Sequence, residues 1–181
     1  MSEIIQTGLA SYGLSGQLFH APFLVTNPGF TLKKVWERNK NLSVQRYPQV
    51  EIVRQLDEML NDDDIELIIV NTPDQTHYDY CKRALEAGKH VVVEKPFVLN
   101  LEEGEELIQL ANEKNLVFSV YQNRRWDGDF QTVKQVLDQQ LLGQVVEYEA
   151  HFDRFKNYVD SDKWREKASE SHGLIYDLGS H

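Results

Sequence analysis

A chain of 181 residues, 41% hydrophobic and 27% charged, is long enough to bury the core of one domain, or of one domain and part of another. Its net charge of −10 argues against broad binding to nucleic acid or anionic lipid, and its apolar runs are too short to span a bilayer. The single cysteine, Cys81, excludes an internal disulfide. The N-terminus lacks a signal-peptide pattern. Together, these features predict a cytoplasmic protein without nucleic-acid or membrane partners.

Up to residue 122, the hydrophobic pattern alternates short strand-like runs with longer helical stretches. Strands are expected at residues 4–9, 30–36, 50–53, 66–71, 90–94 and 116–121. Helices are expected from the first glycine-rich turn to about residue 25, up to about residue 60, at 75–87 and at 101–114. Gly88 is placed to end the third of these helices. The alternation predicts an α/β fold over residues 1–122, a Rossmann-type doubly wound parallel sheet.

Residues 123–181 are expected to begin a second α/β domain. A helix is expected at residues 130–140, ended by Gly143, and an alternating run at 144–155 predicts a strand of a different sheet. No later strand-like run precedes residue 181, and a strand of that length without a neighbour would expose its backbone. The second domain is therefore expected to be truncated in this chain, or to receive its missing sheet from elsewhere.

Residues 8–16, Gly-Leu-Ala-Ser-Tyr-Gly-Leu-Ser-Gly, follow the first expected strand in the manner of a dinucleotide-binding turn. Ser11 replaces the usual first glycine, which is tolerated if the turn does not need a positive φ there. Gly13 would let the backbone approach a pyrophosphate, and Gly16 would let helix and strand pack closely. An ordinary glycine-rich turn is the alternative. The expected cofactor contacts are Ser11, Tyr12, Gly13, Leu14, Ser15 and Gly16.

The second expected strand ends in Glu37 and Arg38, where the adenosine ribose of a dinucleotide is usually held. Glu37 would accept hydrogen bonds from both ribose hydroxyls and repel a 2′-phosphate, which favours NAD. Arg38 would instead bind that phosphate, which favours NADP. The cofactor is expected to be NAD or NADP, with a small preference for NAD; a solvated Glu-Arg pair is the alternative.

Thr72, Pro73 and His77 follow the buried fourth strand, at the carboxyl edge where ligands bind in such sheets. Thr72 and Pro73 are expected to shape the wall of the cofactor cleft, and Asp74 to cap the next helix. His77 either contacts the cofactor or is a surface or capping residue.

Glu94, Lys95 and Pro96 end the fifth expected strand at the same edge. A lysine is costly to bury without partners, so its place indicates an ammonium that donates to a substrate hydroxyl oxygen during hydride transfer. Pro96 restricts the backbone of Lys95 and allows a cis peptide bond. The alternative is a solvated lysine at a strand end.

Asp177 and His181 are four positions apart and would share a face if that stretch is helical. A carboxylate beside an imidazole fixes its tautomer and raises its basicity, which suits a general base near neutral pH. Asp-His pairs at this spacing are also common on protein surfaces, which is the alternative.

Together these pieces resemble the Gfo/Idh/MocA oxidoreductase family, and look most like its branch containing NADP-linked scyllo-inositol dehydrogenase. The shared motifs, in order, are the glycine turn, residues 19–22, Thr72-Pro73 with His77, residues 87–91, 94–96, 121–127, 151–155, Trp164-Arg165 and residues 176–181. The resemblance implies that Lys95 binds the reacting hydroxyl, that His181 is the general base, and that Asp177 orients His181.

The resemblance also places other residues at the site. Glu94, Lys95 and Asn123 belong to matched motifs and are expected at the cofactor. Trp164 and Arg165 either reach the nicotinamide end of the cleft or fix a loop. Arg124 and Arg125 either bind substrate or pair with Asp127 and Asp129. Members of the family have a second α/β domain, whose open sheet covers the site and often mediates oligomers. The resemblance therefore implies that the full-length protein is a homo-oligomer.

The cofactor preference of the resembling branch does not carry over, because Glu37-Arg38 stands where that branch has small hydroxyl residues. The sequence predicts an NAD(P)-dependent dehydrogenase that acts on a CH–OH group of a sugar or cyclitol. The alternatives are a non-catalytic dinucleotide-binding sensor and a glycoside hydrolase that uses tightly held NAD. No metal site is expected, because residues 62–64, all aspartate, indicate a solvated loop without further ligands nearby.

Overall fold

The computed structural model describes residues 4–153, 155, 157–158 and 178–179. By its internal contacts the chain divides into two units, Met1–Tyr121 and Gln122–His181. The first unit holds a sheet with its covering helices, and the second holds the remaining described elements.

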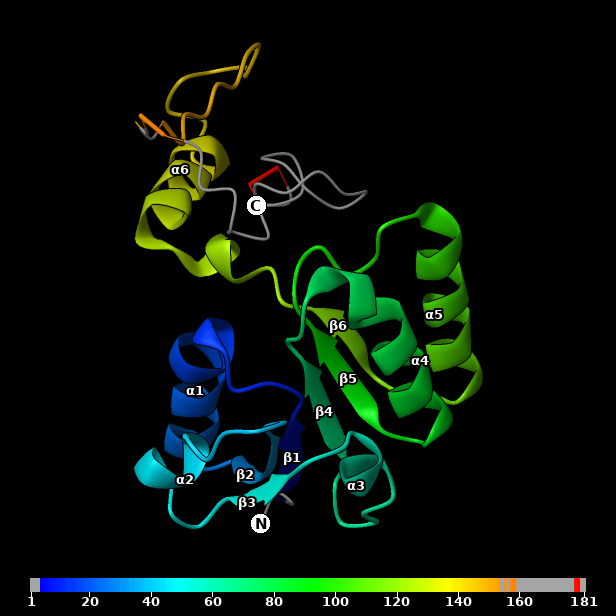
Figure 1. Ribbon diagram of the computed structural model, residues 1–181. Coiled ribbons are helices and arrows are strands. Elements are labelled where there is room, and N and C mark those ends of the chain that lie inside the picture. The colour runs from blue at the N-terminus through cyan, green and yellow to red at the C-terminus, as the bar shows by residue number, and fades with distance from the viewer. Residues whose placement is uncertain (1–3, 154, 156, 159–177, 180–181) are drawn as a thin grey trace. The chain divides into compact units, whose positions relative to one another are not determined.

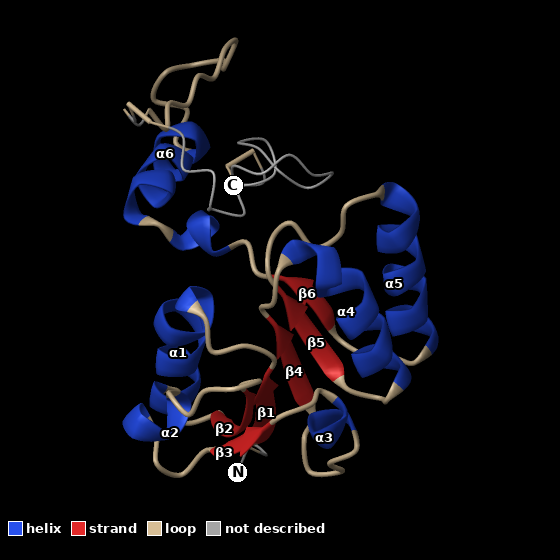
Figure 2. Cartoon of the chain, in the orientation of Figure 1, coloured by secondary structure: helices blue, strands red, loops and turns tan. Residues whose placement is uncertain are grey.

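The first unit is built around a six-stranded parallel sheet in the order β3-β2-β1-β4-β5-β6 (Figure 2). Its strands are β1 (Ile5–Leu9), β2 (Phe30–Trp36), β3 (Glu51–Val53), β4 (Leu67–Val70), β5 (His90–Val93) and β6 (Phe118–Val120). The strand order reverses between β1 and β4, and ligands of such sheets bind at the carboxyl ends beside this reversal. The predicted Rossmann-type doubly wound sheet is confirmed.

Helices cover both faces of the sheet, and the alternation of side chains along β4 divides the core into two (Figure 1). Ile68 and Val70 pack with residues of α3 (Asp57–Leu60), α4 (His77–Glu86) and α5 (Leu101–Glu113), whereas Leu67 and Ile69 pack with residues of α1 (Ala21–Thr26). All four are buried. Successive residues of a strand point to opposite faces, so a strand covered on both sides needs the uninterrupted apolar run that the sequence shows here.

The helical elements of the first unit are a π-helical turn (Gly16–His20) that continues into α1 (Ala21–Thr26), then α2 (Ser43–Arg46), α3 (Asp57–Leu60), a 3₁₀ turn (Asp74–Thr76) that leads into α4 (His77–Glu86), and α5 (Leu101–Glu113). The Asn100 side chain caps α5 by accepting a hydrogen bond from the Glu103 N–H at 2.9 Å. Gly88 follows α4 with a φ of 77°, as expected for the residue that ends it. The sequence pattern does not indicate α2 or the π-helical turn.

The aspartate run at residues 62–64 is more than the solvated loop that was expected, because Asp62 is tied to β2. Lys33 Nζ and Lys34 Nζ each lie 2.9 Å from Asp62 Oδ2. The hydrogen bond from Lys34 comes first among the causes that hold the pKa of Asp62 well below its usual range, against the opposing effect of burial. The ion pairs therefore fasten the loop before β4 to a strand on the other side of β1.

The second unit contains a 3₁₀ turn (Asn123–Trp126) and α6 (Gly128–Asp138), close to the expected helix. The strand expected at 144–155 is wrong, since residues 144–153 and 155 form no strand. An alternating pattern becomes a strand only when a neighbouring strand supplies hydrogen bonds, and no strand is present among the described residues of this unit.

Arg124 Nη1 in this unit forms an ion pair with Asp127 Oδ2 at 2.8 Å, one of the two alternatives expected for Arg124. None of the described helices has the length and apolar character needed to cross a membrane.

Candidate active site

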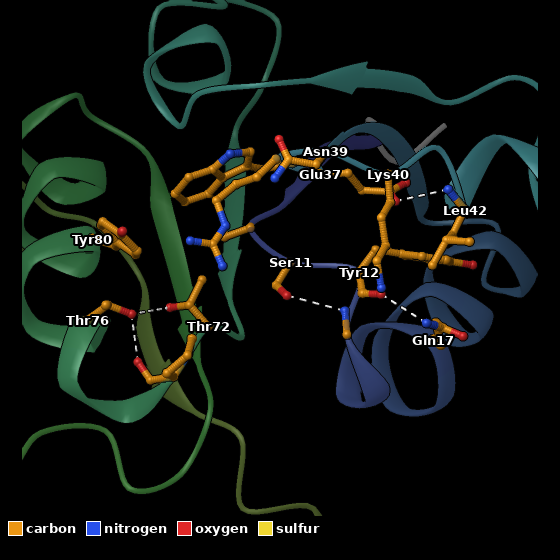
Figure 3. Close-up of a pocket in the computed structure, with 15 residues that line it drawn as sticks. Ser11, Tyr12, Gln17, Glu37, Asn39, Lys40, Leu42, Thr72, Thr76 and Tyr80 are labelled. Carbon is orange, nitrogen blue, oxygen red and sulfur yellow. Dashed lines mark hydrogen bonds between the residues drawn. The ribbon is translucent and has the colours of Figure 1, made fainter. Parts of the chain in front are cut away.

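A cavity of about 460 Å³ opens at the carboxyl ends of β1, β2 and β4 in the first unit (Figure 3). Three segments surround it: the turn after β1, the end of β2 with the following loop, and the segment from the end of β4 into α4. It is lined by Ala10, Ser11, Tyr12, Gly13, Gln17, Trp36, Glu37, Arg38, Asn39, Lys40, Leu42, Thr72, Pro73, Thr76 and Tyr80. The cavity therefore lies where a doubly wound sheet binds its ligands.

Seven of the expected cofactor contacts line this cavity, namely Ser11, Tyr12, Gly13, Glu37, Arg38, Thr72 and Pro73. The expected contacts Leu14, Ser15, Gly16, His77, Glu94 and Lys95 are not among its described lining residues. Asn123 lies in the second unit, at the start of the 3₁₀ turn. Trp164, Arg165, Asp177 and His181 lie outside the described residues.

The turn after β1 is held by bonds within the protein. Ser11 Oγ accepts the N–H of Gly13 at 3.2 Å, and Gln17 Nε2 donates to the carbonyl of Tyr12 at 2.9 Å. The described non-glycine residues with positive φ are Asn115 and Gln140, so Ser11 has an ordinary backbone conformation. A serine therefore replaces the first glycine without strain, and its hydroxyl adds a hydrogen bond that glycine lacks.

The two glycines of this turn differ in what the surrounding protein demands of them. A Cβ on Gly16 would lie 2.3 Å from the carbonyl oxygen of Ser11, so the start of the helix can approach the turn only without a side chain. A Cβ on Gly13 would meet only Ser11 Oγ, at 3.5 Å, which is an ordinary contact. Packing thus explains Gly16, whereas the protein itself leaves space at Gly13.

Asn71, at the end of β4, joins this turn to the middle of the sheet. Its Nδ2 donates to the carbonyl of Ser11 at 2.9 Å and to Ser15 Oγ at 3.3 Å. Asn71 Oδ1 and Tyr12 OH are buried without a hydrogen-bond partner among the described residues. The sequence predicts no specific role for Asn71, although its place directly after the buried fourth strand, at the ligand-binding edge, is a signal for one.

Glu37, at the end of β2, points its carboxylate into the loop that follows it. Oε2 accepts the N–H of Leu42 at 2.9 Å, and Oε1 accepts the N–H and hydroxyl of Ser43 at 2.8 and 2.6 Å. Burial opposes ionisation, yet the hydrogen bonds from Ser43 and Leu42 leave the pKa of Glu37 below its ordinary value. The carboxylate that was expected to accept from ribose hydroxyls is 6% exposed and already accepts three hydrogen bonds.

His77 is buried at the start of α4, with 1% of its surface exposed. Its Nδ1 lies 2.7 Å from the carbonyl oxygen of Pro96, and its Nε2 lies 2.8 Å from that of Thr72. Both ring nitrogens are therefore occupied by carbonyl oxygens, and neither is free for the cofactor contact that was one of the roles considered for His77. The ring instead links the wall of the cavity at Thr72 to the segment that carries Lys95.

Glu94, the residue before Lys95, belongs to a partly buried polar cluster from three elements. His20 Nε2 lies 2.8 Å from Glu94 Oε1, with side chains 2% and 15% exposed. The rings of His20 and Tyr121 have centroids 4.5 Å apart, and Tyr121 OH donates to the carbonyl of Phe19 at 2.9 Å. Burial, and next the charge of Glu94, raise the pKa of Tyr121. The Lys95-Pro96 peptide bond is cis, as the sequence allows.

Comparison with known proteins places this geometry among relatives. The family model described as an oxidoreductase family with an NAD-binding Rossmann fold, GFO_IDH_MocA, matches residues 5–122. The GFO/IDH/MocA C-terminal domain model matches residues 130–181. The scyllo-inositol 2-dehydrogenase (NADP(+)) IolW of Bacillus subtilis is 40% identical over 179 residues, covering 99% of this chain and 50% of that protein. An uncharacterised oxidoreductase of Schizosaccharomyces pombe, C115.03, is 42% identical over 182 residues, covering 98% and 50%.

Two solved structures, both assigned only provisionally as oxidoreductases, share the architecture. One, from Bacteroides fragilis, is 56% identical with a TM-score of 0.87, and the match covers 99% of this chain and 49% of that one. YvaA from Bacillus subtilis is 40% identical with a TM-score of 0.94, over 100% of this chain and 51% of that one. The chain spans about half the length of the relatives it matches.

Proposed function

Since this chain belongs to the Gfo/Idh/MocA family of oxidoreductases with an NAD-binding Rossmann fold, we propose that the full-length protein transfers a hydride between NAD or NADP and a secondary alcohol of a sugar or cyclitol. The observation that carries the proposal is the cavity at the carboxyl edge of the sheet, bordered by the glycine turn, the end of β2 and Thr72-Pro73. The name of the Bacillus relative, a scyllo-inositol 2-dehydrogenase, supports a polyol substrate.

The residues around the cavity fit a dinucleotide. A Cβ on Gly13 would meet only an ordinary contact, so packing within the protein does not explain why this residue is glycine. A pyrophosphate that approaches the backbone closely would explain it. Ser11, Tyr12 and Gly13 would hold the pyrophosphate, and Thr72 and Pro73 would border the nucleotide. When bound, the nicotinamide ring supplies the acceptor for a hydride.

Lys95, His181 and Asp177 are proposed to act on the substrate. When an alcohol is oxidised, its carbon loses a hydrogen with the bonding electron pair, and its hydroxyl loses a proton that needs an acceptor. His181 accepts that proton, with Asp177 orienting the imidazole. The Lys95 ammonium donates to the hydroxyl oxygen and stabilises the negative charge that develops there.

The proposal is tested with the full-length protein, a panel of sugars and cyclitols, and saturating NAD or NADP. Lys95→Met should lower kcat by roughly 10²–10⁴-fold, the usual value of a positioned proton donor, while the cofactor Kd stays within about threefold. Lys134→Met is the matched control, because Lys134 is exposed on α6 and pairs only with Asp138 among the described residues.

Three outcomes would contradict parts of this assignment. Absence of turnover on every polyol, with both cofactors bound, would favour the dinucleotide-binding sensor. Release of sugar from glycosides with cofactor that survives purification would favour the hydrolase. Unchanged turnover in Lys95→Met would remove Lys95 from the catalytic set. The expected homo-oligomer is measured separately, by light scattering of the full-length protein.

A further inference from the structure

An acidic residue at the end of the second strand is the usual sign of NAD, because it accepts from the ribose diol and repels a 2′-phosphate. Glu37 has the right place for that role but another orientation. Both of its oxygens accept hydrogen bonds from Leu42 and Ser43, and Ser43 is fully buried. The carboxylate therefore organises the loop at residues 38–43 from inside.

Arg54, just after β3, holds the same loop from another direction. Its Nη1 donates to the carbonyl of Lys40 at 2.7 Å and to that of Glu37, and its Nη2 donates to the Asn41 side chain. The Arg54 charge also favours the ionised form of Glu37. Hydrogen bonds from Leu42 and Ser43 and the nearby Arg54 charge stabilise the carboxylate of Glu37 within the protein, which weakens its repulsion of an anion in the cavity.

The loop held in this way presents cations to the cavity. Arg38 and Lys40 are exposed and line it, and among the described residues neither side chain forms an ion pair. Glu37 is the single acidic residue among the described residues of the lining. The described wall of the cavity therefore has two unpaired positive charges and one carboxylate that is already satisfied.

We propose that the cavity selects NADP, with Arg38 and Lys40 binding the 2′-phosphate and Glu37 positioning the loop that carries them. This rests on the proposed function, because it specifies which dinucleotide the same cavity takes. It reverses the small preference for NAD drawn from the sequence. Glu37 is a positioning residue for the phosphate, whereas Arg38 and Lys40 are its ligands.

The test is calorimetric titration of the full-length protein with NADP⁺, NAD⁺, 2′,5′-ADP and 5′-AMP. Wild type should bind NADP⁺ and 2′,5′-ADP more tightly than their counterparts without the 2′-phosphate, by about tenfold or more, as hydrogen bonds to charged groups provide. Arg38→Ala should remove most of that difference, because it should weaken the binding of NADP⁺ far more than the binding of NAD⁺. Arg46→Ala, a neighbouring exposed cation outside the lining, is the matched control.

Glu37→Gln separates the two roles of the acid. If Glu37 were a ribose ligand, removing its charge would raise the affinity for NADP⁺ and lower that for NAD⁺. The proposed positioning role predicts the reverse for NADP⁺, a fall of about tenfold, because an amide NH₂ cannot accept from the loop N–H groups. Ser43→Ala, which keeps the carboxylate, should lower NADP⁺ affinity in the same direction if Glu37→Gln does not fold.

Each result decides something different. Tighter NAD⁺ than NADP⁺ binding in wild type, or a gain of NADP⁺ affinity in Glu37→Gln, would overturn the proposed cofactor selection and leave the oxidoreductase assignment intact. Binding of neither dinucleotide by folded full-length protein would overturn the proposed function, and the selection with it.

Discussion

Replacing His77 with alanine should be among the most destabilising single changes in the first unit. The ring is 1% exposed and lies within hydrogen-bond distance of the carbonyl oxygens of Thr72 and Pro96. Alanine removes the ring from both carbonyls and takes the hydrogen-bond donor from at least one of them, at about 1–3 kcal/mol, and it also removes a large buried side chain. With the cost of the remaining void, the loss of unfolding free energy should be about 3–5 kcal/mol.

Urea denaturation of the full-length protein, followed by tryptophan fluorescence, measures this loss. His151→Ala is the matched control, because His151 is 61% exposed and its removal should change stability by no more than about 0.5 kcal/mol. Since Pro96 follows Lys95, we also expect His77→Ala to lower kcat at saturating substrate. A His77→Ala protein within about 0.5 kcal/mol of wild type would refute the inference that these two carbonyls depend on the ring.

Three further predictions concern parts of the first unit away from the cavity. Asn100→Ala should cost about 1 kcal/mol in denaturant titration, because it removes the cap of α5. Asp62→Asn should lower Tm at pH 7, and the gap to wild type should narrow towards pH 3. The depressed pKa of Asp62 gives stability above the ordinary aspartate pKa of about 3.9, and that stability is lost as pH falls below it; a gap that persists at low pH would contradict this. Cys81 is fully buried, and burial raises the pKa of its thiol, so thiol reagents should label it only as the protein unfolds.

The elements that the sequence predicts well are those with a strong local pattern. The run at Leu67–Val70 is apolar at every position, which a strand buried on both faces requires, and Gly88 marks the end of α4 through its backbone alone. The strand expected at 144–155 fails because a strand depends on its neighbours, and alternation of side chains contains no information about them. The short helix α2 has too few residues for any periodicity to show.

In the candidate site, too, the sequence predicts some features and not others: it predicts which positions lie at the site, but not how their side chains are oriented. Turn and strand-end positions such as Ser11, Thr72 and Arg38 follow from the order of strands, because carboxyl ends of parallel strands share one edge. The orientation of a side chain does not follow from its position. Glu37 turns towards Ser43 and His77 turns towards Pro96, and these partners belong to other elements. Only the packed structure fixes which of several nearby acceptors or donors each one meets.

The loop after β2 owes its shape to bonds that exist before any ligand arrives. Fixing the backbone of one residue costs about 1–2 kcal/mol of conformational entropy. Residues 38–43 lose this entropy when the protein folds, so it is not lost again when a ligand binds. A preorganised loop lets more of the contact energy appear as affinity. Under the proposed selection of NADP, the choice of cofactor depends on several residues at once. Exchanging the cofactor by design would require Glu37, Ser43 and Arg54 to be rebuilt together, because each supports the same stretch of chain.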